Sequence, residues 1–320
     1  MDPKPIRGRR IPTTKVRGWI DPMLATLVDA LPDSRGWVFE RKLDGIRAIA
    51  YGDGNGGVRL YPRNKLPLEE SFPSIVDALE GVPGRWVLDG EVVALVGGDA
   101  GGFEALQQRS ARTKLRYYVF DLLSLDDSDV RDLPLLERKK LLRNVPLRGP
   151  LRRTTTRTGD AEKLRQESCE AGWEGLIAKR AAAPYRAGRS RDWLKLKCSN
   201  EQELVVAGYT DPKGSRVGFG ALMLGYYDKD KLRFAGEVGT GFGERQLREL
   251  GDTLKRIEVE ESPFVDLPRA KKGQHFVRPQ LVAQVGFTEW TRDGKLRHPR
   301  FLGLRNDKKA ENVVRERPAR

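Results

Sequence analysis

The segment ERKLDGIR at residues 40–47 places a lysine between two apolar runs that are typical of buried β-strands. Asp44 and Arg47 follow Lys42 within the same segment. A lysine amine is a nucleophile only in its neutral form, which burial or a neighbouring cation favours by lowering the pKa. We therefore expect burial and Arg47 to lower the pKa of Lys42, and we interpret Lys42 as a candidate nucleophile. The alternative is a strand-end lysine that extends its ammonium group into solvent.

Two further lysines have a spacing that suits phosphate. Lys195 and Lys197 alternate with apolar residues in DWLKLKC, so on a β-strand both side chains share one face. Two ammonium groups on one face can converge on one phosphate, where cations stabilise the charge that develops during transfer. An exposed strand face that carries lysines for solubility is the alternative, and the flanking Trp193 and Leu194 argue against it.

Alternating strands and helices must hold these side chains between about residues 21 and 198. The predicted helices are 71–81 and 133–145, and the predicted strands are 36–51, 56–63, 85–96, 115–123, 174–180 and 192–198. Antiparallel sheets with packed helices form an α+β fold, and the segment lacks the glycine-rich turn of a dinucleotide-binding fold.

The pattern changes after Cys198. Residues 202–210 and 281–290 are predicted strands, and 219–239 is a predicted hairpin that turns at DKDK. Between them, residues 243–257 form a predicted helix with four apolar residues on one face: Leu247, Leu250, Leu254 and Ile257. Short strands with one helix are typical of a small closed barrel such as an OB-fold.

Length and charge limit the class of protein. A chain of 320 residues can form two domains, and we expect a basic arm at 1–20, an α+β domain at 21–200 and a barrel at 201–320. The 59 basic residues exceed the 45 acidic ones, which leaves a net charge of +14 and favours a polyanionic partner. We find no membrane-spanning run or signal peptide. The two cysteines, Cys169 and Cys198, suggest free thiols in a reducing cytoplasm.

A series of motifs in this order resembles the covalent nucleotidyltransferases, which include DNA ligases, RNA ligases and mRNA capping enzymes. The motifs are ERKLDGIR (40–47), LYPRN (60–64), LDGEVVAL (88–95), YYVFDLL (117–123), WEGLIAKR (173–180), DWLKLKC (192–198) and LRNDK (304–308). The sequences EGLIAKR and WLKLK are similar to the corresponding motifs of ATP-dependent DNA ligases. SPFVDLPR, YRAGRSRDWLKLK and FTEWTRDGKLRHPRFLGLRNDK resemble the ligase domain of bacterial non-homologous end-joining ligases.

The resemblance implies a function. We expect an ATP-dependent DNA ligase that seals 3′-hydroxyl/5′-phosphate breaks through a lysyl-AMP intermediate, in DNA repair or end joining. Only 41 residues precede Lys42, so we expect no domain for nicotinamide and ATP as the donor. An RNA ligase, a capping-type enzyme and a non-catalytic nucleic-acid clamp are the alternatives.

The resemblance also implies roles for individual residues. Lys42 and Asp44 in the first motif, and Arg305, Asp307 and Lys308 in the last, match catalytic positions; the last motif is expected to close over ATP and orient pyrophosphate. Glu91 and Glu174 match positions that hold a divalent cation, Mg²⁺ or Mn²⁺. The remaining positions match contacts to the nucleotide: Glu40 at the adenine amino group, Phe120 on the adenine ring, and Arg47, Arg63, Glu91, Lys179, Trp193, Lys195 and Lys197 elsewhere on it.

The implied partner is nicked or broken duplex DNA, with a Ku-like end-binding protein as a possible recruiter. We expect a monomer in the bacterial cytoplasm. Glu237 stands where many relatives are expected to have a basic residue, which would weaken contact with DNA there.

Overall fold

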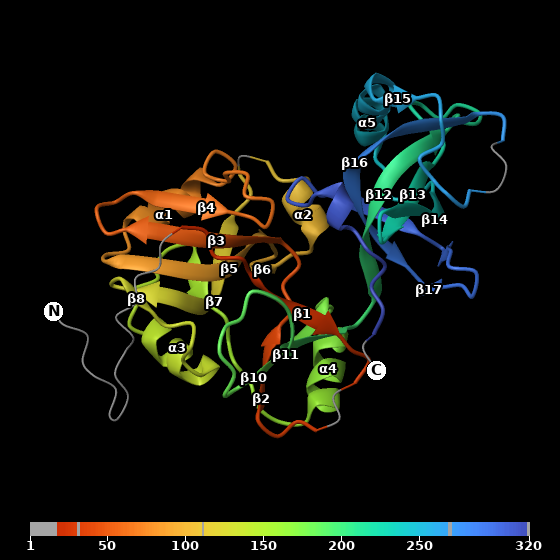
Figure 1. Ribbon diagram of the computed structural model, residues 1–320. Coiled ribbons are helices and arrows are strands. Elements are labelled where there is room, and N and C mark those ends of the chain that lie inside the picture. The colour runs from red at the N-terminus through yellow and green to blue at the C-terminus, as the bar shows by residue number, and fades with distance from the viewer. Residues whose placement is uncertain (1–17, 31–32, 111, 268–270, 319–320) are drawn as a thin grey trace. The chain divides into compact units, whose positions relative to one another are not determined.

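The computed structural model describes residues 18–30, 33–110, 112–267 and 271–318, which belong to two compact units (Figure 1). The boundary between the units lies between Cys198 and Ser199, against a predicted boundary at residue 200. The predicted basic arm at residues 1–20 falls almost wholly outside the described residues.

The larger sheet of unit 1 has seven strands in the order β4-β3-β5-β7-β8, with β6 beside β5 and β9 beside β7. They are β3 (Ile46–Asp53), β4 (Val58–Tyr61), β5 (Arg85–Val96), β6 (Asp99–Ala100), β7 (Leu115–Leu125), β8 (Ser128–Asp129) and β9 (Leu151–Arg153). Three helices pack against this sheet: α1 (Pro73–Glu80), α2 (Phe103–Gln107) and α3 (Leu135–Leu142). The strands predicted at 56–63, 85–96 and 115–123 and both predicted helices are confirmed: β4 and the helices are shorter than predicted, β5 has the predicted bounds, and β7 extends two residues further.

The smaller sheet of unit 1 has the order β1-β11-β10-β2. Its strands are β1 (Met23–Leu27), β2 (Trp37–Arg41), β10 (Gly175–Arg180) and β11 (Gly188–Lys197). Helix α4 (Ala161–Glu170) packs against β10 and β2. The sequence did not predict α4, because only Ala161, Leu164 and Ser168 of its ten residues are buried and the apolar stripe is narrow.

One predicted strand of unit 1 is wrong. Residues 36–51 do not form one strand: the chain leaves β2 at Arg41, enters β3 at Ile46, and these strands belong to different sheets. A Cβ on Gly45 would lie 2.1 Å from the carbonyl oxygen of Val92, so this crossing needs a glycine. The sheets of unit 1 are mostly antiparallel, as predicted, and two strand pairs are parallel: β1 with β11 and β7 with β9.

Unit 2 is a curled sheet covered by one helix. The strands β12 (Asn200–Thr210), β13 (Leu222–Asp228), β14 (Lys231–Val238), β15 (Glu258–Val259) and β16 (Gln274–Phe287) run in the order β14-β13-β12-β16-β15, with β19 (Arg300–Leu304) beside β16. A separate pair is β17 (Glu289–Trp290) and β18 (Leu296–Arg297). Helix α5 (Glu244–Arg256) buries the predicted apolar face, and a 3-10 turn covers Ala310–Asn312.

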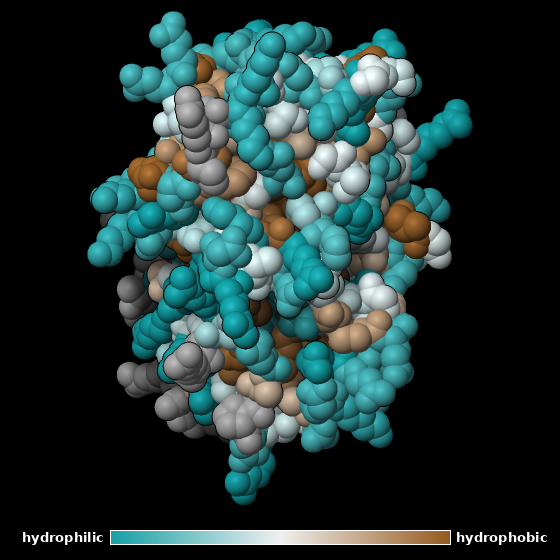
Figure 2. Space-filling view, turned by 90° about the vertical axis from the view of Figure 1, so that its right-hand side faces the viewer, coloured by the Kyte–Doolittle hydropathy of each residue, from teal (hydrophilic) through white to brown (hydrophobic). Residues whose placement is uncertain are grey.

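One face of the molecule is mainly hydrophilic (Figure 2). Figure 2 shows hydrophilic residues over most of one face, with hydrophobic residues in small separate groups. Among the described residues, no helix is long and apolar enough to cross a membrane.

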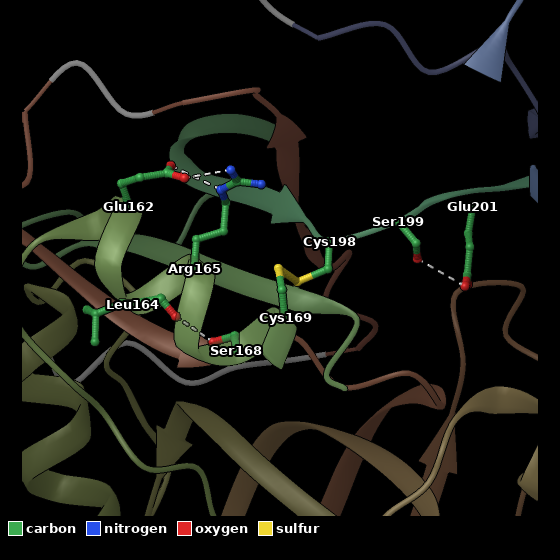
Figure 3. The surroundings of a disulfide bond; sticks show 8 residues. All are labelled: Glu162, Leu164, Arg165, Ser168, Cys169, Cys198, Ser199 and Glu201. Atoms are coloured by element: carbon green, nitrogen blue, oxygen red, sulfur yellow. Dashed lines mark hydrogen bonds and ion pairs between the residues drawn. A yellow bond between two sulfur atoms is a disulfide. The ribbon is translucent and has the colours of Figure 1, made fainter. Parts of the chain in front are cut away.

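The two cysteines form a disulfide bond, so the prediction of two free thiols is wrong. Cys169 lies in the last turn of α4 and Cys198 directly follows β11 (Figure 3). Their Cα atoms are 5.4 Å apart, although 29 positions separate them in the sequence. The sequence carried no signal for this pairing, because the packing of the unpredicted α4 on its sheet brings the two residues together.

We expect reduction of this disulfide to destabilise unit 1. The bond closes a loop that contains β10 and β11, and loop closure of this length lowers the entropy of the unfolded chain by an amount worth about 3–4 kcal/mol. Urea unfolding of unit 1 with and without dithiothreitol measures the difference. The Cys169→Ser/Cys198→Ser double variant is the control and should not respond to reductant. Superimposable curves for the wild type would contradict this prediction.

Candidate active site

Lys42 lies in the crossing between β2 and β3, where the chain passes from the smaller to the larger sheet of unit 1. Its backbone N–H donates to the carbonyl oxygen of Gly175 at 2.9 Å. Its ammonium group forms an ion pair with the carboxylate of Glu174, and both side chains are largely buried. The predicted nucleophile and a predicted metal ligand therefore meet at one place.

The prediction that the pKa of Lys42 is lowered is wrong. Burial acts in that direction, but the carboxylates of Glu174, Asp44 and Glu91 outweigh it and raise the pKa of Lys42 above its ordinary value. Arg47 does not act as the expected cation, because its guanidinium group pairs with Asp89. To attack an electrophile, Lys42 must therefore lose a proton and separate from Glu174.

Both acidic and basic side chains lie near Lys42 and Glu174. Burial and the charge of Asp44 raise the pKa of Glu174, while Lys42 and Lys197 lower it, and the net shift is upward. Lys197 stands opposite Gly175 across the β10–β11 ladder. Asp44 accepts a hydrogen bond from the backbone N–H of Phe103 at 2.7 Å, which places its carboxylate at the start of α2. This arrangement gathers carboxylates and ammonium groups beside one amine.

Glu40 is buried in a cluster of its own with two lysines and a threonine. Its Oε2 accepts from Thr154 Oγ1 at 2.7 Å and from Lys179 Nζ at 3.1 Å, and its Oε1 lies 2.5 Å from Lys139 Nζ. Burial alone would raise the pKa of the Glu40 carboxyl, but the charges of Lys139 and Lys179 override burial and lower this pKa to about 2. Glu40 is therefore an anion with fixed orientation.

Aromatic rings adjoin this cluster. The Lys179 ammonium group lies 4.3 Å from the ring centroid of Phe120 and 4.1 Å from that of Trp193, and the two rings meet edge to face. Burial lowers the pKa of Lys179 to about 8. Trp193 Nε1 is buried and has no hydrogen-bond partner within the described part of the chain. The structure thus brings together four of the residues that the sequence predicts at the nucleotide.

Arg47 holds the two sheets of unit 1 together. Its guanidinium group donates two hydrogen bonds to Asp89, at 3.0 and 2.6 Å, and one to the carbonyl oxygen of Met23 at 2.7 Å. Tyr185 donates to Asp89 at 2.7 Å, which completes a buried network. Asp89 and Arg47 belong to the larger sheet and Met23 to the smaller one, so this arginine has a structural role. Contact with a nucleotide stays a prediction.

The other predicted contacts lie at strand ends or faces. Lys195 and Lys197 are half-buried and alternate with the buried Leu194 and Leu196, so they share one face of β11 as predicted. Arg63 is exposed in the turn after β4. Contact of these three residues with a nucleotide stays a prediction.

The last motif forms its own ion pairs within unit 2. Arg305 and Asp307 are both buried, and two hydrogen bonds of 2.8 Å join the guanidinium group to the carboxylate. Lys308 pairs with Glu203 of β12 at 2.7 Å. Burial would raise the pKa of Asp307, but Arg305 and Lys308 lower it. Glu237 accepts a hydrogen bond from Gln274 at 3.1 Å.

Sequence reasoning missed Lys139, Thr154, Asp89 and Tyr185. A signal existed for Lys139, because the helical spacing places it four residues after Leu135 and three before Leu142, on the buried face of α3. Thr154 follows β9 and contacts Glu40 only through the tertiary fold, so nothing in its local sequence marks it.

A buried lysine paired with a carboxylate at the crossing of two sheets, near a cluster of charged and aromatic side chains around Glu40, is the arrangement expected of a covalent nucleotidyltransferase. A family model described as the ATP dependent DNA ligase domain matches residues 22–197, and one described as the ATP dependent DNA ligase C terminal region matches residues 215–308. The chain therefore belongs to the ATP-dependent DNA ligases.

Individual relatives agree with the family. A multifunctional non-homologous end joining protein LigD from Pseudomonas aeruginosa is 40% identical over 326 residues, which cover 98% of this chain and 38% of the relative. A LigD from Mycobacterium tuberculosis is 39% identical over 302 residues, covering 92% of this chain and 40% of the relative. The chain thus spans about two fifths of the length of these curated relatives.

A solved structure is also similar. A structure described as mycobacterial DNA ligase D complexed with ATP and MES has 37% sequence identity and a TM-score of 0.66, and the match covers 92% of this chain and 98% of that chain. These matches confirm the predicted fold class, an α+β adenylation domain followed by an OB-fold barrel. They favour a DNA ligase over the RNA ligase and capping enzyme alternatives.

We predict that Arg305→Ala destabilises unit 2, because it leaves the buried Asp307 carboxylate without its bidentate partner. Loss of one member of a buried ion pair costs about 3–5 kcal/mol. Arg297→Ala is the control, since Arg297 and Glu289 form an exposed pair at 2.7 Å and such pairs contribute at most about 1 kcal/mol. Urea unfolding of unit 2 measures both variants, and equal effects would argue against a stabilising role for the Arg305–Asp307 pair.

Proposed function

We propose that this chain seals breaks in duplex DNA with ATP, through an AMP group held covalently on Lys42. The observation that carries the proposal is the pairing of Lys42 with Glu174 at the crossing between the two sheets of a ligase-family domain. Asp44 acts on the amine and Lys197 acts on Glu174, and these are the charges that a transferred phosphate and its counterion require.

The Glu40 cluster fits an adenine base. Glu40 Oε1 is buried and has no hydrogen bond of ordinary geometry from the described residues, although Lys139 neutralises it. An exocyclic amino group is a donor that this acceptor can bind. The rings of Phe120 and Trp193 offer flat surfaces, and stacking on a base is worth roughly 1–3 kcal/mol.

The carboxylates near Lys42 fit a hard divalent cation. Asp44, Glu91 and Glu174 offer oxygen ligands, and Mg²⁺ or Mn²⁺ needs only one or two of these when phosphates complete its shell. Such an ion would supply neutralisation of the phosphate charge. Glu174 and Asp44 would hold such an ion, and Lys42 would have to leave its ion pair with Glu174 before losing its proton.

The chemistry consists of three transfers at phosphorus. The neutral amine of Lys42 attacks the α-phosphate, a nitrogen–phosphorus bond forms, and the bond to pyrophosphate breaks. AMP then moves to the 5′-phosphate at a break, and the neighbouring 3′-hydroxyl displaces it. Lys195 and Lys197 are proposed to hold the α-phosphate, whose charge grows in each step. We assign Arg305, Asp307 and Lys308 to the pyrophosphate, which is present only in the first step.

The setting we propose is DNA end joining in the bacterial cytoplasm. The net charge of +14 supports binding to backbone phosphates, and the curated relatives are named as non-homologous end joining proteins. A Ku-like protein that binds DNA ends is the proposed recruiter of a monomeric chain. In that compartment the Cys169–Cys198 disulfide must withstand thiol reductants.

We predict that Lys42→Ala abolishes the covalent intermediate. Incubation with ATP and Mg²⁺ should add the mass of one AMP to the wild type and nothing to the variant, because alanine has no amine. Binding to nicked DNA should persist in the variant and weaken steeply with salt, since backbone phosphates provide most of the contact. Lys163→Ala, at an exposed position on α4, is the control and should gain AMP normally.

Two outcomes would contradict the proposal. One is a single AMP on Lys42→Ala, which would place the nucleophile elsewhere. The other is wild-type protein that gains AMP but seals nicked RNA in preference to nicked DNA, which would identify an RNA ligase.

A further inference from the structure

Lys139 on α3 is a buried lysine that none of the motifs includes. Its side chain is 10% exposed, whereas that of the next residue, Lys140, is 58% exposed and pairs with Glu137 on the surface. Lys139 Nζ lies 2.5 Å from Glu40 Oε1 and donates a hydrogen bond to the carbonyl oxygen of Phe120 at 3.1 Å. One ammonium group therefore contacts both the carboxylate and the backbone of the aromatic residue in the proposed base pocket.

The helix that carries Lys139 is itself fixed in place. Arg138 donates two hydrogen bonds of 2.8 Å to Asp121, and both side chains are fully buried. Asp121 follows Phe120 on β7, so this pair anchors α3 to the same strand that presents the ring. The ion pair of Arg138 with Asp121 therefore fixes the backbone at Lys139 relative to Phe120.

The contacts of Glu40 leave a defined position for a ligand. A carboxylate has about four lone-pair positions. Thr154 and Lys179 occupy those of Oε2, and Lys139 is the cation nearest to Oε1. The remaining acceptor position is therefore on Oε1, and its direction depends on where Lys139 holds that oxygen.

We propose that Lys139 is a positioning residue for recognition of the purine base. It fixes the carboxylate that accepts the amino group at the base edge, relative to the ring that stacks on the base face. This inference rests on the proposed function, because it assumes that Glu40 and Phe120 contact the base of ATP.

The same geometry explains discrimination against guanine. Guanine carries an oxygen where adenine carries an amino group, and an oxygen facing the fixed Glu40 carboxylate brings two acceptors together. A carboxylate that can rotate avoids this repulsion. Removal of Lys139 should therefore weaken binding of ATP and also reduce the preference for ATP over GTP.

Lys139→Met and Lys139→Arg test the inference, with Lys140→Met as the matched surface control. The measurement is the rate of lysyl-AMP and lysyl-GMP formation as a function of ATP and GTP concentration, in the full chain with Mg²⁺. Sealing of a nick that already carries a 5′-adenylate serves as a second readout, since that step needs no recognition of free ATP.

For Lys139→Met we expect KM for ATP to rise roughly tenfold or more, as loss of a charged hydrogen bond commonly produces. The rate at saturating ATP should change much less, the preference for ATP over GTP should fall, and sealing of the pre-adenylated nick should stay near the wild-type rate. Lys139→Arg keeps the charge and should restore much of the preference. Lys140→Met should behave as the wild type.

Unchanged KM and nucleotide preference in Lys139→Met would overturn the inference. A lower rate of lysyl-AMP formation at saturating ATP in Lys139→Met, with KM and nucleotide preference unchanged, would also overturn it. If Lys139→Met does not fold, Lys139→Gln replaces it as the uncharged variant. A preference for ATP over GTP that is no higher in Lys139→Arg than in Lys139→Gln would then also overturn the inference. Failure of the wild type to form any lysyl-AMP would instead reject the proposed function.

Discussion

The ammonium group of Lys42 is buried against the carboxylate of Glu174, and the rest of the active site is arranged around that ion pair. A buried charge without a partner is strongly unfavourable, so each charge in this region has an opposite charge nearby. The pair stabilises the charged form of the amine, which is the form that cannot attack. In the proposed function, Lys42 would have to leave its ion pair with Glu174 before the amine could lose its proton. Asp44 and Lys197 are close enough to shift these charges electrostatically.

The same constraint accounts for the other buried pairs of unit 1. Arg47 with Asp89 joins the two sheets, and Arg138 with Asp121 fixes α3 on β7. These two pairs fix the strands and the helix that carry the residues around Glu40. Glu40, in contrast, has two lysines for one carboxylate, and the excess of positive charge keeps it an anion in the proposed base site. Buried ion pairs that hold the fold together are thus neighbours of the carboxylate that is proposed to bind the base.

The sequence predicted what local patterns encode. The alternation in DWLKLKC placed Lys195 and Lys197 on one face, and the four apolar residues of α5 predicted its buried side. It failed where the tertiary fold decides. The break between β2 and β3, the parallel pairing of β1 with β11 and the disulfide depend on residues distant in sequence. The raised pKa of Lys42 was missed for the same reason, because Glu91 on β5 and Glu174, which directly precedes β10, are distant from Lys42 in sequence.

The claim that Glu174 holds Lys42 as an ammonium group is tested most directly by NMR titration of the Lys42 side chain in lysine-labelled protein, with Lys42→Arg to assign its signal. The account predicts that Lys42 titrates above the ordinary lysine value of 10.5, and that Glu174→Gln lowers its pKa. A Lys42 that titrates below 10.5 in the wild type, or a pKa unchanged by Glu174→Gln, would contradict the account.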